Sequence, residues 1–135
     1  MEQTFAIIKP RAVEEKHVGS IIAMIEAAGF DLVALEKVTI SRKQAEELYA
    51  EHKEKPFFGE MVKSMTSAPV IIMKLQKDNA VLAWRDLMGA TNPANAAAGT
   101  VRALYGRGIG DNATHGSDST ASAARELKIF FGGCC

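Results

Sequence analysis

The sequence predicts an α/β fold, an α+β sandwich in which helices cover a small and mostly antiparallel sheet. Apolar runs typical of strands alternate with segments whose apolar residues recur at helical spacing, in the order strand, helix, strand, helices, strand, helices. This order contains two β-α-β crossings, which are characteristic of sheets covered by helices. No internal repeat and no linker interrupts the 135 residues, so we expect one domain over residues 1–135.

The first half of the chain begins with a buried strand. Residues 4–9 (TFAIIK) form a short apolar run that ends at Pro10, which indicates that the strand stops there. Residues 18–28 carry apolar side chains at helical spacing, and Gly29 follows as the C-cap. Residues 32–40 are rich in β-branched side chains and partly alternate, which predicts a second strand.

Two helical segments precede the third strand. Ser41 and Gln44 have the spacing of a capping box, which predicts a helix that carries Tyr49. A second helix is expected after Pro56, because apolar side chains recur there at helical spacing. The residues of this stripe are Phe58, Met61, Val62 and Met65.

The second half of the chain contains the third strand, a long irregular segment and the last helix. Residues 70–75 (VIIMKL) predict the strand, and Asp78 is expected to cap the helix that follows it. Residues 89–118 hold six glycines and show no clean periodicity, so we expect a long functional loop with a short strand near Thr114. Ser119 is expected to cap the final helix.

The composition argues against several classes of protein. The net charge is +0, so no broad basic surface is available for nucleic acid or for an anionic membrane. The two cysteines, Cys134 and Cys135, stand at the chain end, which suits a reducing compartment. Residues 1–12 do not have the pattern of a signal peptide, and no apolar run approaches the ~18 residues of a membrane span. We therefore expect a cytoplasmic protein.

Hydrogen-bond donors and cations gather around the long loop and indicate phosphate binding. The chain lacks G-x-x-x-x-G-K-[ST], and the glycines of residues 106–110 do not have the spacing of a dinucleotide motif. A phosphate must therefore meet side chains or isolated backbone amides, and arginine can pair with two phosphate oxygens at once. The candidates are Arg85, Thr91, Asn92, Arg102 and Asn112.

His115, within the segment 112–119 (NATHGSDS), is the candidate nucleophile. A neutral imidazole is nucleophilic near pH 7 because its reference pKa is ~6.5. Its attack on a terminal phosphate would form a phosphoramidate, which can pass the group to a second acceptor. The other ring nitrogen then needs an acceptor that fixes the tautomer, and Ser117 or Glu126 is within reach.

Two further histidines and one phenylalanine are candidates for contacts with a phosphate or a base. His17 stands in a polar stretch and is expected to be exposed, whereas His52 could face a phosphate. Phe58 fits the apolar stripe of its helix, so we expect its neighbour Phe57 to be exposed beside basic residues. An exposed aromatic ring there suits base stacking, with peripheral packing as the alternative.

The segment 112–119 resembles the active-site signature of nucleoside diphosphate kinases. This resemblance runs from about Thr4 to Phe131. It implies a ferredoxin-like βαββαβ core with a four-stranded antiparallel sheet, additional helices and a long loop before His115. It also implies a ping-pong transfer of the γ-phosphate from a nucleoside triphosphate, mainly ATP, to a nucleoside diphosphate, which maintains triphosphate pools. Four other segments agree in order: Ile8-Lys9-Pro10, Tyr49-x-x-His52-Lys53 with Pro56-Phe57-Phe58, residues 87–93 (LMGATNP) and residues 99–102 (GTVR).

The resemblance implies roles for residues that would contact the nucleoside. Lys9 and Asn112 would hold a sugar hydroxyl. Phe57 would stack on one face of the base, and Ile109 would lie on the other. Tyr49 also falls at a position where the family contacts the nucleotide.

The resemblance further implies how phosphate and His115 are held. Ser117 and Glu126 match the partners that orient the histidine. Magnesium would bridge phosphate oxygens, with no direct protein ligand and with Asp118 reaching it through water. The residues that would hold phosphates are His52, Arg85, Thr91 and Arg102.

The resemblance implies a homo-oligomer, a tetramer or a hexamer built from dimers, and Pro93 lies in a loop that the family uses for subunit contacts. Two positions depart from the family pattern: Arg11 replaces an acidic residue, and Leu104 replaces an aspartate before Tyr105. The loss of that acid is expected to loosen the glycine-rich loop. The C-terminal tail is also short.

Two other functions fit parts of the sequence. A protein with this pattern could bind nucleotides in a regulatory role without catalysis, but the catalytic positions are all filled here. A single-stranded nucleic-acid binder would use Phe57 and the arginines, but the net charge of +0 argues against it.

Overall fold

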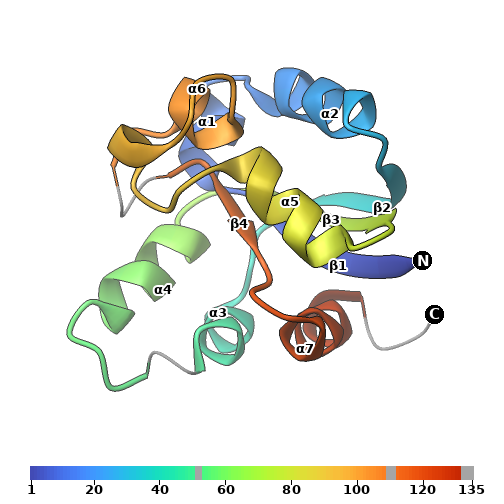
Figure 1. Ribbon diagram of the computed structural model, residues 1–135. Helices are drawn as coiled ribbons and strands as arrows, with labels where there is room; N and C mark the ends of the chain where they lie inside the picture. Colours follow the sequence, from blue (N-terminus) through green and yellow to red (C-terminus); the bar gives the residue numbers. More distant parts are fainter. Residues whose placement is uncertain (51–52, 109–111, 132–135) are drawn as a thin grey trace.

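The computed structural model describes residues 1–50, 53–108 and 112–131 (Figure 1). Its centre is a four-stranded sheet in the order β2-β3-β1-β4, in which every neighbouring pair is antiparallel. This order confirms the expected fold class. The strands are β1 (Glu2–Ile8), β2 (Asp31–Val38), β3 (Val70–Lys77) and β4 (Thr114–Gly116).

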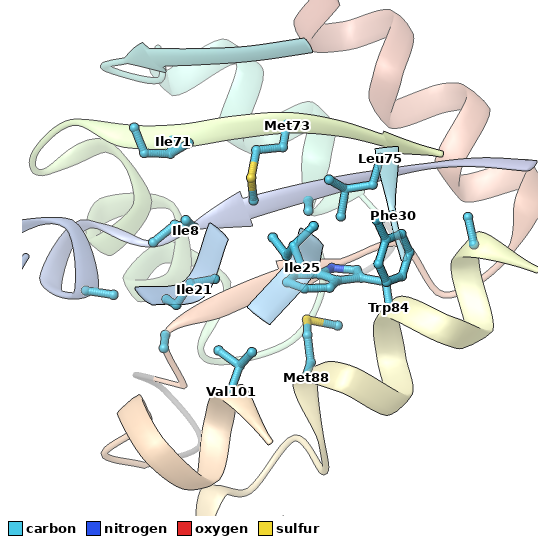
Figure 2. Packing of buried hydrophobic residues seen from close by; sticks show 14 residues of the cluster. Ile8, Ile21, Ile25, Phe30, Ile71, Met73, Leu75, Trp84, Met88 and Val101 are labelled. Carbon is cyan, nitrogen blue, oxygen red and sulfur yellow. The ribbon is translucent and has the colours of Figure 1, made fainter. Parts of the chain in front are cut away.

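Both faces of the central strands are covered by helices. Along β1, Ala6 and Ile8 point to one core cluster, whereas Phe5 and Ile7 point to the other, as the two-residue period of a strand requires. Trp84 fills the centre of the first cluster (Figure 2). That cluster lies under α2 (Val18–Ala27) and α5 (Ala80–Met88), and the second lies under α3 (Arg42–Leu48), α4 (Phe58–Thr66) and α7 (Thr120–Phe131).

Local capping explains where two of these helices start. Ser41 and Gln44 form the expected capping box, because each side chain bonds to the other residue's backbone N–H at 3.1 Å. The Ser119 hydroxyl accepts a hydrogen bond from the Ser122 N–H at 3.1 Å, as expected at the start of α7. Gly29 follows α2 with a φ of +92°, a conformation that suits glycine at this position.

The expectation that Asp78 caps α5 was wrong. Asn79 takes the N-cap position in a left-handed conformation, which asparagine tolerates, and its side chain makes no cap hydrogen bond. The N-cap of α5 therefore lies one residue after the expected position, Asp78. The Glu2 carboxylate instead accepts the Val81 N–H at 2.8 Å, so α5 is capped from β1.

Short helices occupy segments where none was expected. Pro10 does not simply end the first strand, because it is the first residue of α1 (Pro10–Glu14), a position that proline favours. The long segment before His115 contains a 3₁₀ helix, η2 (Pro93–Asn95), and α6 (Val101–Tyr105), whose N-cap is Thr100. Helices of this length contain too few turns to display an apolar period. No helix in the described part of the chain is long and apolar enough to cross a membrane.

Candidate functional site

His115 lies on β4 at the edge of the sheet, where its backbone is fixed from two sides. It pairs with Ile7 in the register of β1 and β4. The indole N–H of Trp84 donates to the His115 carbonyl oxygen at 3.2 Å. A Cβ at Gly116 would lie 2.5 Å from Trp84 Cδ1, so only glycine lets β4 approach α5 this closely. The strand therefore holds the imidazole at a fixed position.

A tight turn leads the chain into this strand. The Thr114 N–H donates to the Asn112 carbonyl oxygen at 2.9 Å, which closes a three-residue turn around Ala113. Ala113 has a φ of +73°, which is unfavourable for a residue with a Cβ. The Lys9 N–H bonds to the Ala113 carbonyl oxygen at 2.8 Å and ties this turn to the end of β1.

The imidazole of His115 contacts a buried carboxylate. His115 Nε2 lies 2.9 Å from Glu126 Oε1, and the Ser117 hydroxyl donates to the same oxygen at 2.8 Å. Glu126 is 4% exposed and projects from α7, whereas the imidazole is 17% exposed. A neutral imidazole that donates its Nε2–H to the carboxylate keeps the lone pair on Nδ1. In that tautomer the arrangement leaves the Nδ1 lone pair available.

Tyr49 closes another side of the imidazole. Its ring is perpendicular to that of His115, at an interplanar angle of 89° and a centroid distance of 6.3 Å. Burial raises the pKa of the Tyr49 phenol, and the negative charge of Glu126 adds to this effect. Tyr49 therefore stays protonated at neutral pH and is able to donate a hydrogen bond.

Three of the expected nucleotide contacts form one hydrogen-bonded chain. Lys9 Nζ donates to Asn112 Oδ1 at 2.7 Å, and Asn112 Nδ2 donates to the Thr91 carbonyl oxygen at 3.1 Å. These residues come from the end of β1, the segment after α5 and the turn before β4. The fold thus brings them together although they are far apart in the sequence.

Arg85, Thr91 and Arg102 line an open cavity of about 470 Å³ beside this chain. Arg102 is 8% exposed and donates to the carbonyl oxygens of Gly89 and Thr114, both at 3.1 Å. Burial, and then the nearby Arg85, lowers the pKa of Arg102 to about 10, so it remains a cation at neutral pH. Two guanidinium groups at one cavity suit the binding of an anion. The remaining lining residues are Leu82, Asp86, Gly89, Ala90, Asn95, Ala97 and Thr100.

Phe57 lies at the start of α4 with half of its surface exposed, and Lys55 Nζ is 5.8 Å from the centre of its ring. Phe58 packs against the second core cluster, as its helical spacing predicted. Two other expected contacts, His52 and Ile109, lie outside the described residues.

Asp118 is an exposed carboxylate beside His115 and Arg85. A hydrogen bond from Ser122 holds the pKa of Asp118 below its usual value, and the charge of Arg85 adds to this effect. Within the ranges that the structure describes, no three His, Cys, Asp or Glu side chains gather as a metal cage. An ionised carboxylate is nevertheless a hard oxygen donor of the kind that Mg²⁺ prefers.

A cluster of charges that was not predicted from the sequence joins α1 to α6, and we call it the α1 clamp (Arg11, Glu15 and Arg107). Arg11 pairs with Glu15 at 2.7 Å, and Arg107 pairs with the other Glu15 oxygen at 2.9 Å. Arg11 also donates to the Tyr105 carbonyl oxygen at 2.7 Å. The spacing of Arg11 and Glu15, four residues apart in a helix, is the signal that could have revealed the first pair.

The fold and the site together define a phosphotransferase, in which a histidine oriented by a buried carboxylate stands beside a cavity lined by arginines. The model of the nucleoside diphosphate kinase family matches residues 2–134. The chain belongs to the nucleoside diphosphate kinase family. This result confirms the family and the enzyme class expected from the sequence.

Curated relatives and solved structures agree with this assignment. The nucleoside diphosphate kinase of Citrifermentans bemidjiense is 53% identical over 131 residues, which are 97% of this chain and 96% of that relative. The crystal structure of the Encephalitozoon cuniculi enzyme matches with a TM-score of 0.95 at 39% identity, over 98% of this chain and 90% of that one. The Halobacterium salinarum enzyme in complex with CDP matches with a TM-score of 0.93 at 39% identity, over 96% and 87% of the two chains.

Proposed function

We propose that His115 carries the phosphate in a ping-pong exchange between a nucleoside triphosphate, mainly ATP, and a nucleoside diphosphate. The observation that supports this role is the 2.9 Å contact of His115 Nε2 with Glu126 Oε1. This contact occupies one ring nitrogen and leaves Nδ1 with its lone pair. Glu126 also stabilises the positive charge that the ring gains as Nδ1 forms a bond.

The exchange takes place in two balanced half-reactions. In the first, the Nδ1 lone pair attacks the γ-phosphorus, an N–P bond forms, and the bond to the βγ-bridging oxygen breaks. The nucleoside diphosphate leaves with that electron pair. In the second, a terminal oxygen of another nucleoside diphosphate attacks the phosphorus, and the N–P bond breaks and returns its electron pair to Nδ1.

The other site residues would position the nucleotide. Arg85, Thr91 and Arg102, which line the cavity, and His52 would bind phosphates. The Lys9–Asn112 pair would bind a sugar hydroxyl, and this role is supported by its 2.7 Å hydrogen bond. Phe57 would stack on the base, with Ile109 on the other face, and its half-exposed ring is available for this contact.

Magnesium is the cofactor that we propose for this reaction. The residues at the site suit a Mg²⁺ ion carried by the nucleotide, because Asp118 offers an ionised carboxylate and the cavity offers cations for the remaining phosphate charge. When bound, the ion would neutralise and orient phosphate oxygens. Asp118 would hold it through water.

We also propose that the protein is cytoplasmic and assembles as a tetramer or a hexamer built from dimers. The strand β2 supports assembly because it lies at one edge of the sheet. Val33 and Leu35 on this strand are 47% and 40% exposed, and an exposed apolar edge is usually covered in the native assembly.

Incubation with ATP labelled at the γ-phosphate tests the role of His115. We expect an acid-labile, alkali-stable label on the wild-type chain, loss of that label in His115→Asn, and retention in the control His17→Asn. A label that persists in His115→Asn would refute the proposed mechanism. Nucleotide binding without any label would instead favour the regulatory role.

A further inference from the structure

We propose that Arg125 is a positioning residue for phosphate transfer, because it holds the Glu126 carboxylate in the orientation that faces His115. The proposal rests on the proposed role of His115. The relevant atom is Glu126 Oε2, the carboxylate oxygen that does not contact the imidazole.

The two hydrogen bonds that orient His115 converge on a single oxygen of Glu126. His115 and Ser117 both contact Oε1, at 2.9 and 2.8 Å. The second oxygen, Oε2, lies 3.6 Å from Arg125 Nη2. The Glu126 side chain is 5% exposed, so little water is available to stabilise its charge. A cation beside Oε2 therefore attracts this oxygen and opposes rotation of the carboxylate.

Arg125 is itself held in place, so it differs from a freely moving surface side chain. Its Nη1 donates to the Glu47 carbonyl oxygen at 2.7 Å, in the last turn of α3. A cation at this end of a helix is favoured by the helix dipole. The guanidinium thus reaches from α7 to α3 and contacts Glu126 from a fixed position.

This bridge connects the two groups that flank the imidazole. Tyr49, whose ring is perpendicular to that of His115, is the C-cap residue of α3, and α7 carries Glu126. Arg125 contacts both helices, through Glu47 and Glu126. Neither of these contacts, with Glu47 or with Glu126, involves a residue proposed to hold the nucleotide. A change at Arg125 should therefore affect the chemical step and leave substrate binding intact.

The size of the expected effect follows from geometry. The Arg125 side chain is 37% exposed, and its contact with Glu126 is longer than a hydrogen bond, so solvent screens part of the interaction. We expect Arg125→Met to lower kcat about fivefold, with an unchanged KM for the nucleoside diphosphate. Arg125→Lys keeps the charge and should restore most of the rate.

The test measures the full chain by steady-state kinetics and by ¹⁵N NMR of its three histidines. The matched control is Lys128→Met, which removes an exposed cation from the same helix. Arg125→Met should lower kcat and reduce the proportion of His115 protonated at Nε2, whereas Lys128→Met should do neither. If Arg125→Met fails to fold, Arg125→Gln and Arg125→Lys are compared by the same measurements.

Three results would overturn the proposal: a kcat for Arg125→Met equal to that of wild type, a loss that appears only in KM, or an equal loss in Lys128→Met. Failure of the proposed function is a separate outcome. In that case the wild-type chain itself would not form the acid-labile label on His115, before any change at Arg125.

Discussion

Two clusters of charged side chains have nearly the same contact distances but different surroundings. In the His115 cluster, Glu126 accepts from His115 and Ser117 at 2.9 and 2.8 Å. In the α1 clamp, Glu15 meets Arg11 and Arg107 at 2.7 and 2.9 Å. The Glu126 side chain is 5% exposed, whereas that of Glu15 is 31% exposed. The two clusters therefore differ in burial and not in contact distance.

The difference arises from solvent screening. Water around the α1 clamp weakens each ion pair and replaces its partners when one is lost. A buried carboxylate has no such replacement, so its contacts determine the orientation of the neighbouring imidazole. The same substitution, glutamate to glutamine, should therefore have very different effects at the two positions.

The largest effect is expected for Glu126→Gln. The amide has the same shape but no charge, so it stabilises the positive imidazole ring of the transition state poorly and presents either an oxygen or an NH₂ group to Nε2. We expect kcat to fall about 100-fold, as measured by transfer of phosphate from ATP to a nucleoside diphosphate. Glu15→Gln is the matched control and should keep the wild-type kcat. Equal losses in the two variants would contradict the comparison.

An intermediate effect is expected for Ser117→Ala. This change removes one of the two donors to Glu126 Oε1 and leaves the contact with His115. We expect the free energy of unfolding to fall by about 1–3 kcal/mol, because a buried bond to a charged group is lost. Urea denaturation measures this loss. Ser67→Ala, at an exposed position beyond α4, is the control and should change stability far less.

The smallest effect is expected in the α1 clamp and concerns stability alone. Burial would raise the pKa of Glu15, but Arg107 and Arg11 outweigh this effect and lower it. Because the pKa of Glu15 is lowered in the folded state, the ionised carboxylate stabilises the fold fully at a pH above the usual carboxyl pKa of 4.5. This contribution is lost as the pH falls through the lowered pKa. Glu15→Gln should therefore lower Tm slightly at pH 7. The Tm difference between the two proteins should vanish at about 1 M salt. A Tm difference that resists salt would show that the clamp behaves as a buried pair.

The sequence was sufficient to predict features that depend on local patterns. The strand at residues 70–75, the Ser41 capping box and the partnership of His115 with Glu126 and Ser117 all follow from periodicity or from a motif, and the structure contains each of them. These features are encoded within short segments, or in a signature that the whole family shares.

Contacts between distant segments could not be predicted in the same way. Glu2 caps α5 although 79 residues separate it from Val81, and Arg107 pairs with Glu15 across 92 residues. No local pattern relates such positions, because the sheet brings them together only after it forms. The loss of an acid at Leu104 was expected to loosen the loop, yet Arg11 binds the Tyr105 carbonyl oxygen next to it. A tertiary contact between α1 and α6 therefore holds this part of the loop.

The hydrogen bond from Trp84 to the His115 carbonyl has a practical consequence. Trp84 is the single tryptophan of the chain, and it is fully buried. Its indole N–H contacts the backbone of the residue proposed to carry phosphate. The emission of this single tryptophan, excited at wavelengths that the two tyrosines do not absorb, therefore reports on the strand that carries His115. A change in β4 during turnover can be followed by tryptophan fluorescence, without any added label.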